Sequence, residues 1–438
     1  RQLADNLAGI EVDAKRPRYA LIAYHYEESG EGVKAIEYYE KAAEQALRLY
    51  AIENTRQYLT HIKRLELHVG RTNQAHLISP EQISHRHRLW GEVADAYGDL
   101  ESSRDHYERV LSYMQLGTDD DMTISKIPLR GKNSPLTQPE LDLLFAVGRL
   151  LTIYLLHGDW ARAQSVISRQ SALYFVLGMD TEWIETMAIE AWIYYYQGNF
   201  KRSMQLFNRI FFLGKQKKLA SLLHFGGSGI IMNALRLEVD NSELQEHVDS
   251  LHQELERIED TSSTLVLDGV LSFAYWTLGD KETARKYVDS ALSVIDGVNE
   301  FRLYEFAGIV GVIETLLRQG AEQMDDKLLA EIRLASRALH IFAQVYPLAR
   351  PRAWIYQGRQ DKLRNKYKRA VTDLQLAIKE AQKCNISYDE GVAYLTLARL
   401  VKGKDTKYPV YLDLAIARFA EVEAMPQLKK AQDLRDQA

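Results

Sequence analysis

The residues with the most obvious potential for chemistry are a glycine-rich stretch, two histidines, three aspartates and one cysteine. The glycine-rich stretch, His224–Gly229, reads HFGGSG. A phosphate-binding loop of the Walker type needs a lysine after its last glycine and a strand before the first, and neither is present. Ile230 and Ile231 follow instead. We therefore expect close packing between helices here, with a ligand-facing loop as the alternative.

The histidines, aspartates and cysteine lack the spacing of a metal or catalytic site. His85 and His87 are two positions apart, and such neighbours on a helix point in different directions. Asp119–Asp121 lacks the spaced oxygen ligands and the glycine of a calcium loop. Cys384 has no base near it in the sequence, so a buried thiol is the better interpretation. We expect no metal, no cofactor and no catalytic residue, and we predict that the chain is not an enzyme.

A basic run and a group of aromatic residues have the chemistry of binding surfaces. Arg359–Arg369 carries six basic residues and one acidic residue. Such a run can bind phosphate or nucleic acid, but it spans a predicted turn, which favours a solvated surface. The aromatic residues lie on predicted first helices of helical hairpins, where large amphipathic rings can anchor a partner, and core packing is the alternative. These partner-binding candidates are Trp192, Tyr195, Tyr196, Phe273 and Trp276.

Helices must position all of these residues, because the chain has only 9 prolines in 438 residues and is rich in helix-forming types. The stretch Ile193–Ile210 shows the unit: an aromatic helix end, Gly198, and a second helix with small Ser203 and large Phe207. Glycine ends a helix without strain, and a small residue lets two helices cross closely. The same spacing follows other turn residues: Gly30, Gly98, Gly158, Gly279 and Asn365.

This recurring pattern resembles the tetratricopeptide repeat, in which helical hairpins stack into a solenoid. The resemblance predicts an all-α fold with a right-handed superhelix and an extended concave surface. Residues 117–139 are polar and contain three prolines, which favours a linker or long surface loop. We therefore predict helical hairpins over residues 1–116, a linker over 117–139 and a repeat array over 140–438.

Two segments have a narrower resemblance. Tyr19–Leu59 and Leu89–Leu111 resemble the region that follows the ATPase module of signalling proteins with a STAND-type, AAA-like ATPase. These proteins include class III adenylate cyclases of the soluble type and related kinases and transcription regulators. The resemblance implies that catalytic and ATP-binding domains lie upstream. The chain begins with Arg1 rather than methionine, so we expect it to be a piece of a longer protein.

Charge and composition complete the expectations about partners. The net charge of −5 gives no case for nucleic acid or an anionic membrane, and we expect neither. One cysteine suits a reducing cytoplasm. The leading hypothesis is a non-catalytic regulatory arm that binds a protein or peptide, including other domains of its own chain. The alternative is a small-molecule-sensing domain of an ATPase-linked transcription regulator. A deep pocket would favour this alternative, whereas an open groove would favour a peptide partner.

Overall fold

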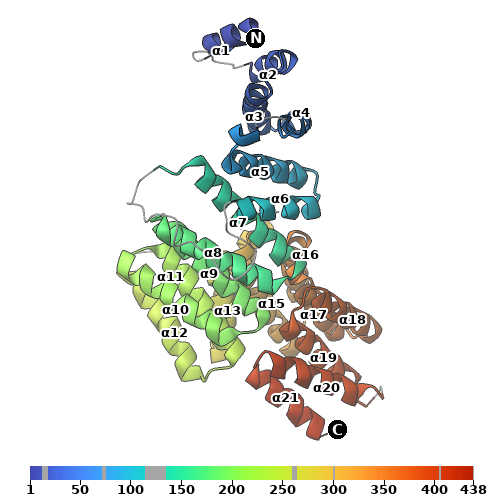
Figure 1. Cartoon of the computed structure of the whole chain (residues 1–438). Coiled ribbons are helices and arrows are strands. Elements are labelled where there is room, and N and C mark those ends of the chain that lie inside the picture. The colour runs from blue at the N-terminus through green and yellow to red at the C-terminus, as the bar shows by residue number, and fades with distance from the viewer. Residues whose placement is uncertain are drawn as a thin grey trace. The chain divides into compact units, whose positions relative to one another are not determined.

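The computed structural model describes residues 1–11, 18–71, 75–113, 135–258, 264–298, 301–403 and 406–437, and these contain helices and no strand (Figure 1). The all-α prediction is therefore confirmed. None of the helices in these ranges is long and apolar enough to cross a membrane. In chain order the α-helices are α1 (Gln2–Glu11), α2 (Tyr19–Glu28), α3 (Gly32–Arg48), α4 (Ile52–Val69), α5 (Pro80–Ala96), α6 (Leu100–Tyr113), α7 (Gln138–His157), α8 (Trp160–Val176), α9 (Asp180–Gln197), α10 (Phe200–Lys217), α11 (Ala220–Leu237), α12 (Asn241–Arg257), α13 (Leu265–Leu278), α14 (Lys281–Asp296), α15 (Phe306–Glu322), α16 (Asp326–Val345), α17 (Arg350–Leu363), α18 (Tyr367–Lys383), α19 (Ser387–Val401), α20 (Tyr408–Glu421) and α21 (Met425–Asp436).

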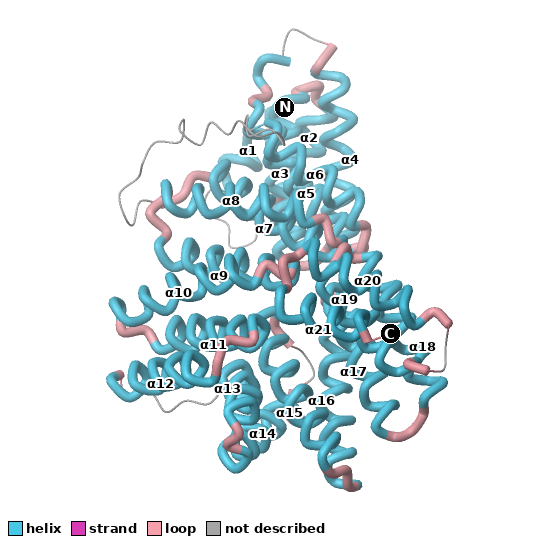
Figure 2. Tube along the Cα trace, turned by 90° about the horizontal axis from the view of Figure 1, so that it is seen from below, coloured by secondary structure: helices cyan, strands magenta, loops and turns pink. Residues whose placement is uncertain are grey.

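Two compact units make up the chain. Unit 1 contains Arg1–Ile153 and Ser165–Asp180, and unit 2 contains Tyr154–Gln164 and Thr181–Ala438. In both units most consecutive helices pack as hairpins, such as α3 with α4 and α17 with α18 (Figure 2). Residues 114–134 lie outside the described ranges, so most of the predicted linker over 117–139 does too. The predicted division into 1–116 and 140–438 stays a prediction.

The turn between the paired helices has the geometry that the repeat pattern predicts. Gly30, Gly98, Gly158, Gly198 and Gly279 all have positive φ, between 66° and 94°, and Asn365 has φ 57°. The backbone there is left-handed, which glycine and asparagine tolerate best. The small residues five positions later are fully buried: Ala35, Ser103, Ala163, Ser203, Ala284 and Ala370. The sequence pattern therefore predicts both the turn of a tetratricopeptide-like hairpin and the point where its two helices cross.

The HFGGSG stretch lies inside α11 and packs against α10, so the packing interpretation is confirmed and the loop alternative is wrong. A side-chain carbon at Gly226 would lie 2.6 Å from the backbone nitrogen of Phe211, and one at Gly229 would lie 2.3 Å from the Phe207 ring. Both distances are far shorter than van der Waals contact. The glycines therefore let the two helices approach each other, and they face a neighbouring helix rather than a ligand.

Within unit 2, hairpin turns from the beginning of the unit contact helices near its end. The Trp160 indole nitrogen donates to the carbonyl oxygens of Cys384 and Asn385, both at 3.0 Å. The Asn385 amide in turn donates to the carbonyl oxygen of Gly158 at 3.4 Å. A side-chain carbon at Gly158 would lie 2.4 Å from the Cys384 carbonyl oxygen. Residues more than two hundred positions apart are thus in direct contact, and the repeat array of unit 2 closes on itself.

Candidate functional site

The aromatic residues predicted to bind a partner lie mostly in the interior of unit 2. Trp192, Tyr195, Tyr196 and Phe273 are 3%, 3%, 6% and 3% exposed. Trp276 is half-buried, with the Lys281 ammonium 5.1 Å from its ring centre. The structure therefore places four of the five candidates where the core-packing alternative expects them. Their part in binding a partner stays a prediction.

These rings pack against one another and against later helices. The Trp192 and Tyr195 rings meet edge to face with centres 5.3 Å apart, and Tyr196 contacts Phe306 of α15 at 5.1 Å. Aromatic pairs in such geometry add to the stability that burial alone provides. The Tyr195 hydroxyl accepts a hydrogen bond from Arg236 Nε at 3.1 Å. The aromatic cluster therefore packs directly behind a polar site. The sequence did not reveal that site.

That site is a pocket of about 350 Å³, which we call the arginine pocket. Five helices of unit 2 contribute to it: α11, α15, α17, α19 and α21. Its described lining contains seven basic and two acidic residues: Arg236, Arg318, Arg352, Arg359, Lys362, Arg399 and Lys430, with Glu238 and Glu314. This excess of positive charge in a concave, partly buried space favours an anionic ligand, because low-dielectric walls strengthen every charge interaction.

Glu314 is the central counter-ion of the arginine pocket. Its carboxylate accepts hydrogen bonds from the Tyr356 hydroxyl at 2.9 Å and from Arg359 Nη1 at 2.8 Å, and it lies 3.6 Å from Arg236 Nη1. Burial alone would raise the pKa of Glu314, but the Arg359 and Arg236 guanidinium groups outweigh it and hold that pKa well below its usual range. One carboxylate therefore balances two guanidinium groups and is ionised at neutral pH.

A second buried ion pair orients the neighbouring arginine. Arg352 Nε lies 3.1 and 3.2 Å from the two carboxylate oxygens of Asp389, and its Nη2 bonds the same carboxylate. The Arg352 guanidinium also lies 5.6 Å from the centre of the Tyr388 ring and 5.9 Å from that of Tyr356. A fork of this kind fixes the plane of the guanidinium. Arg352 is therefore preorganised at the pocket wall.

Among the described residues, several cations of the arginine pocket lack a hydrogen-bond acceptor or an ion pair. Arg236 is 8% exposed, and its Nη2 has no hydrogen-bond partner among the described residues. Arg318, Lys362 and Arg399 form no ion pair within the described ranges. Burial and the neighbouring Arg359 guanidinium lower the pKa of Arg399. A buried donor without an acceptor costs free energy, and an anion in the pocket would supply that acceptor.

The basic run Arg359–Arg369 contributes only in part. Arg359 and Lys362 line the arginine pocket, whereas Arg364 and Arg369 lie 3.7 Å from the buried carboxylate of Asp361. The run is therefore neither wholly a solvated surface nor wholly a binding site. Its charge density was a usable signal, but the other cations of the pocket come from separate helices with no local motif.

The remaining candidates have structural roles where the structure describes them. His85 hydrogen-bonds to Asp142 at 2.8 Å and to Glu44 at 2.7 Å. Burial opposes the charged ring, but these two hydrogen bonds outweigh it and raise the pKa of His85 to about 9. Cys384 is buried, and burial raises the pKa of its thiol. Asp119–Asp121 lies outside the described residues.

No group of three or more metal-ligating side chains occurs in the described ranges. His85 and His87 have different partners, as their spacing predicts, because the His87 ring instead meets His106. The described lining of the arginine pocket contains arginine, lysine, glutamate and tyrosine side chains but no cysteine, serine or histidine. The fold is that of a tetratricopeptide-like helical-repeat protein, and its second unit encloses a pocket lined mainly by basic residues.

Comparison with known proteins gives structural neighbours only. No family model and no curated protein matches the chain. Among solved structures, it is similar to a human IFIT1 dimer with m7Gppp-AAAA at 14% identity and a TM-score of 0.35, covering 99% of this chain and 94% of that one. It is also similar to a monomeric IFIT1 mutant with Gppp-AAAA at 14% identity and a TM-score of 0.37, covering 81% and 78%. At this similarity no function is transferred from IFIT1.

These neighbours nevertheless overturn one expectation. The exclusion of nucleic acid as a partner is wrong, since the similar structures are IFIT1 complexes with capped RNA. The physical reason lies in the argument from net charge. A value of −5 averages over the whole chain, whereas an anion meets only the local potential. The arginine pocket shows how a chain with net negative charge holds a strongly positive site.

Proposed function

We propose that this chain is a non-catalytic helical-repeat arm whose second unit senses a small phosphate-bearing ligand in the arginine pocket. The observation that carries the proposal is the Arg236 guanidinium, which is buried, faces the pocket and has an unpaired Nη2. Guanidinium groups recognise phosphate and carboxylate through parallel hydrogen bonds. Phosphate is the better match, because one carboxylate would leave most of the excess positive charge unbalanced.

The size of the pocket supports one of the two functions that the sequence left open. A volume of about 350 Å³ falls in the range of sites for small molecules, roughly 300–1,000 Å³. An open groove for a peptide would instead require the ends of unit 2 to lie apart, and Trp160 and Asn385 join them. The pocket therefore favours small-molecule sensing over peptide binding as the primary role of unit 2.

The wider context of the proposal rests on the sequence. The resemblance of Tyr19–Leu59 and Leu89–Leu111 to segments after a STAND-type ATPase supports a role as the regulatory arm of an ATPase- or cyclase-linked signalling protein in the cytoplasm. Under this proposal, ligand binding in unit 2 changes how the arm contacts other domains of its own chain. The phosphate itself has two possible sources, a free nucleotide or diphosphate and the end of an RNA chain.

Calorimetric titration of the full chain tests the proposal. Pyrophosphate, ATP and a tetranucleotide RNA are the probes, so that the two sources of phosphate are compared directly. Arg399→Met removes a rim cation without breaking an ion pair and should weaken binding about tenfold, the value of one charge-assisted contact. Arg333→Met, at an exposed position of α16 outside the pocket, should leave affinity unchanged. Equal affinity of both variants, or no binding of any probe, would refute the proposal.

A further inference from the structure

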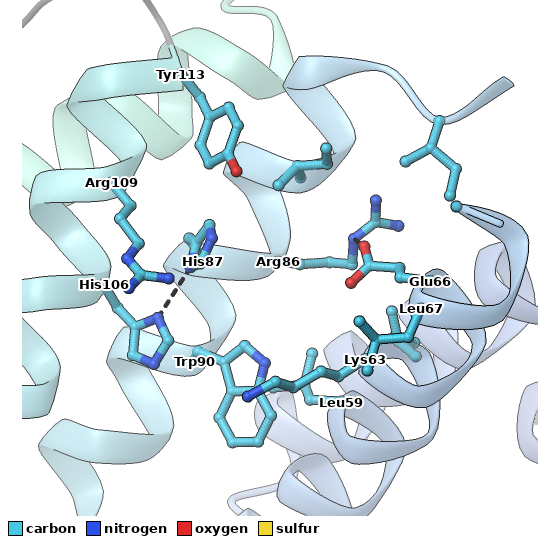
Figure 3. Close-up of a pocket in the computed structure, with 14 residues that line it drawn as sticks. Leu59, Lys63, Glu66, Leu67, Arg86, His87, Trp90, His106, Arg109 and Tyr113 are labelled. Atoms are coloured by element: carbon cyan, nitrogen blue, oxygen red, sulfur yellow. Dashed lines mark hydrogen bonds and ion pairs between the residues drawn. The ribbon is translucent and has the colours of Figure 1, made fainter. Parts of the chain in front are cut away.

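Unit 1 contains a second cavity, of about 500 Å³, between α4, α5 and α6 (Figure 3). We call it the histidine pocket. Apolar side chains such as Leu59 form part of its wall, and most of the rest is aromatic or basic, with Glu66 as an acidic exception. The chemically distinctive lining residues are Lys63, Arg86, His87, Trp90, His106 and Arg109. None of them lines the arginine pocket, so the two sites are independent.

Parallel rings give the histidine pocket flat walls. The Trp90 and His106 rings stack with centres 5.9 Å apart and an interplanar angle of 11°. The His87 and Tyr113 rings stack at 5.5 Å and 19°. Trp90 and the two histidines are only partly buried, and Figure 3 shows these rings gathered along one side of the cavity. Such half-exposed ring faces are the usual platform for a planar ligand, because every aromatic ring can stack on them.

The two histidines of the cavity are neutral. Their Nδ1 atoms lie 2.9 Å apart, so that one ring donates a hydrogen and the other accepts it. Burial is the main cause that lowers the pKa of His87 to about 4, and the neighbouring His106 is the next. Burial also lowers the pKa of His106. At neutral pH these rings therefore add hydrogen-bonding and stacking surfaces without adding charge.

Three other lining residues carry the positive charge of the cavity. Lys63 and Arg109 are exposed at its edge, and Glu66 is its one acidic lining residue. Arg86 is buried, with Nη1 donating to Glu40 at 3.1 Å and Nε lying 3.0 Å from Glu66. Its Nη2 has no hydrogen-bond partner in the described part of the chain. As in unit 2, a buried guanidinium nitrogen is left without an acceptor beside a cavity.

We propose that the histidine pocket binds a mononucleotide-class ligand, a planar heterocycle joined to a phosphate. The ring would stack along Trp90 and His106, and the phosphate would lie toward Lys63, Arg86 and Arg109. A cavity of about 500 Å³ has room for both parts, whereas an isolated phosphate would leave the aromatic walls unused. This site is separate from the one under Proposed function and does not depend on it.

Titration of the full chain with AMP, adenosine and inorganic phosphate tests the assignment. We expect AMP to bind more tightly than either of its parts. The double variant Lys63→Met/Arg109→Met should weaken AMP binding at least about tenfold, with adenosine much less affected. Both positions are exposed and form no ion pair in the described ranges, so the variant should fold. Trp90→Leu should weaken AMP and adenosine alike, because stacking contributes to both.

The variant Arg399→Met is the matched control, since it alters only the arginine pocket. AMP binding that survives Arg399→Met and is lost in Lys63→Met/Arg109→Met assigns the nucleotide to unit 1. Three results would overturn the proposal: no AMP binding up to about 1 mM, unchanged binding in the double variant, or inorganic phosphate binding as tightly as AMP. Binding of a phosphotyrosine peptide without binding of AMP would also overturn it, in favour of a protein partner.

Discussion

Replacing Glu314 by glutamine isolates the role of the one carboxylate that balances the centre of the arginine pocket. The variant keeps the shape of the side chain and one acceptor for the Tyr356 hydroxyl or Arg359. It removes the negative charge that faces Arg359 at 2.8 Å and Arg236 at 3.6 Å. The buried Arg236 guanidinium and the partly buried Arg359 guanidinium then lose their shared counter-ion. Breaking a buried pair in this way costs about 3–5 kcal/mol.

The expected loss for Glu314→Gln is about 3 kcal/mol, at the lower end of that range because the amide still accepts one hydrogen bond. For a unit of this size, about 2 °C of thermal midpoint corresponds to 1 kcal/mol, so the transition of unit 2 should fall by about 6 °C. Differential scanning calorimetry measures the shift. Glu282→Gln is the control, because Glu282 and Lys286 form an exposed pair of little energetic value.

The same variant should bind anions more tightly. Pyrophosphate can replace the missing charge, so it should raise the midpoint of Glu314→Gln more than that of the wild type. A midpoint within about 1 °C of the wild type would show that Glu314 does not balance the guanidinium groups. A destabilised variant that gains nothing from pyrophosphate would show that the pocket does not admit an anion. Either result would refute the reasoning from uncompensated charge.

Three further predictions concern packing, closure and pH. Gly269→Ala would place a carbon 2.1 Å from the Gly308 carbonyl oxygen and should cost about 3 kcal/mol on denaturant titration. Trp160→Phe removes the indole donor and should cost about 1 kcal/mol, with faster hydrogen exchange at residues 384–387. Burial, and after it the charge of Asp361, raises the pKa of Asp373 to about 6. The protonated Asp373 carboxyl therefore stabilises the folded state below pH 4, and this stabilisation is lost as the pH rises through 6. Asp373→Asn should therefore equal the wild type near pH 4 and exceed it in stability at pH 7, as measured by melts across this range.

The hairpins could be predicted from sequence because their determinants lie within about one repeat of each other. Gly198 at a left-handed turn and buried Ser203 five positions later are local features, and a single stretch of sequence contains both. A structural feature formed by residues close together in the chain can therefore be recognised from a short stretch of sequence.

The arginine pocket could not be predicted, because its residues become neighbours only when unit 2 closes on itself. Arg236, Glu314 and Lys430 come from three helices far apart in the sequence, and each alone resembles an ordinary surface charge. The aromatic residues named from the sequence do not line the pocket, for a related reason. Tyr195 lies on a predicted first helix of a hairpin, but whether its side chain is open or covered depends on other helices of unit 2, such as α11, whose Arg236 donates to its hydroxyl.

The arginine pocket and the closure of unit 2 share residues, so we expect ligand binding and closure to be coupled. Arg236 lines the pocket with its side chain, while its carbonyl oxygen accepts a hydrogen bond from Gln427 of α21 at 3.3 Å, and Lys430 of α21 pairs with Glu238. A ligand that needs all of these groups binds only when α21 is in place, so it must stabilise that position. Pyrophosphate at one hundred times its Kd should add about 2.7 kcal/mol to the opening of α21 and slow its hydrogen exchange about a hundredfold. Helix α3 of unit 1 is the internal control and should not change. Bound pyrophosphate with unchanged exchange in α21 would mean that the ligand occupies the pocket without α21, and that closure is a property of the fold alone.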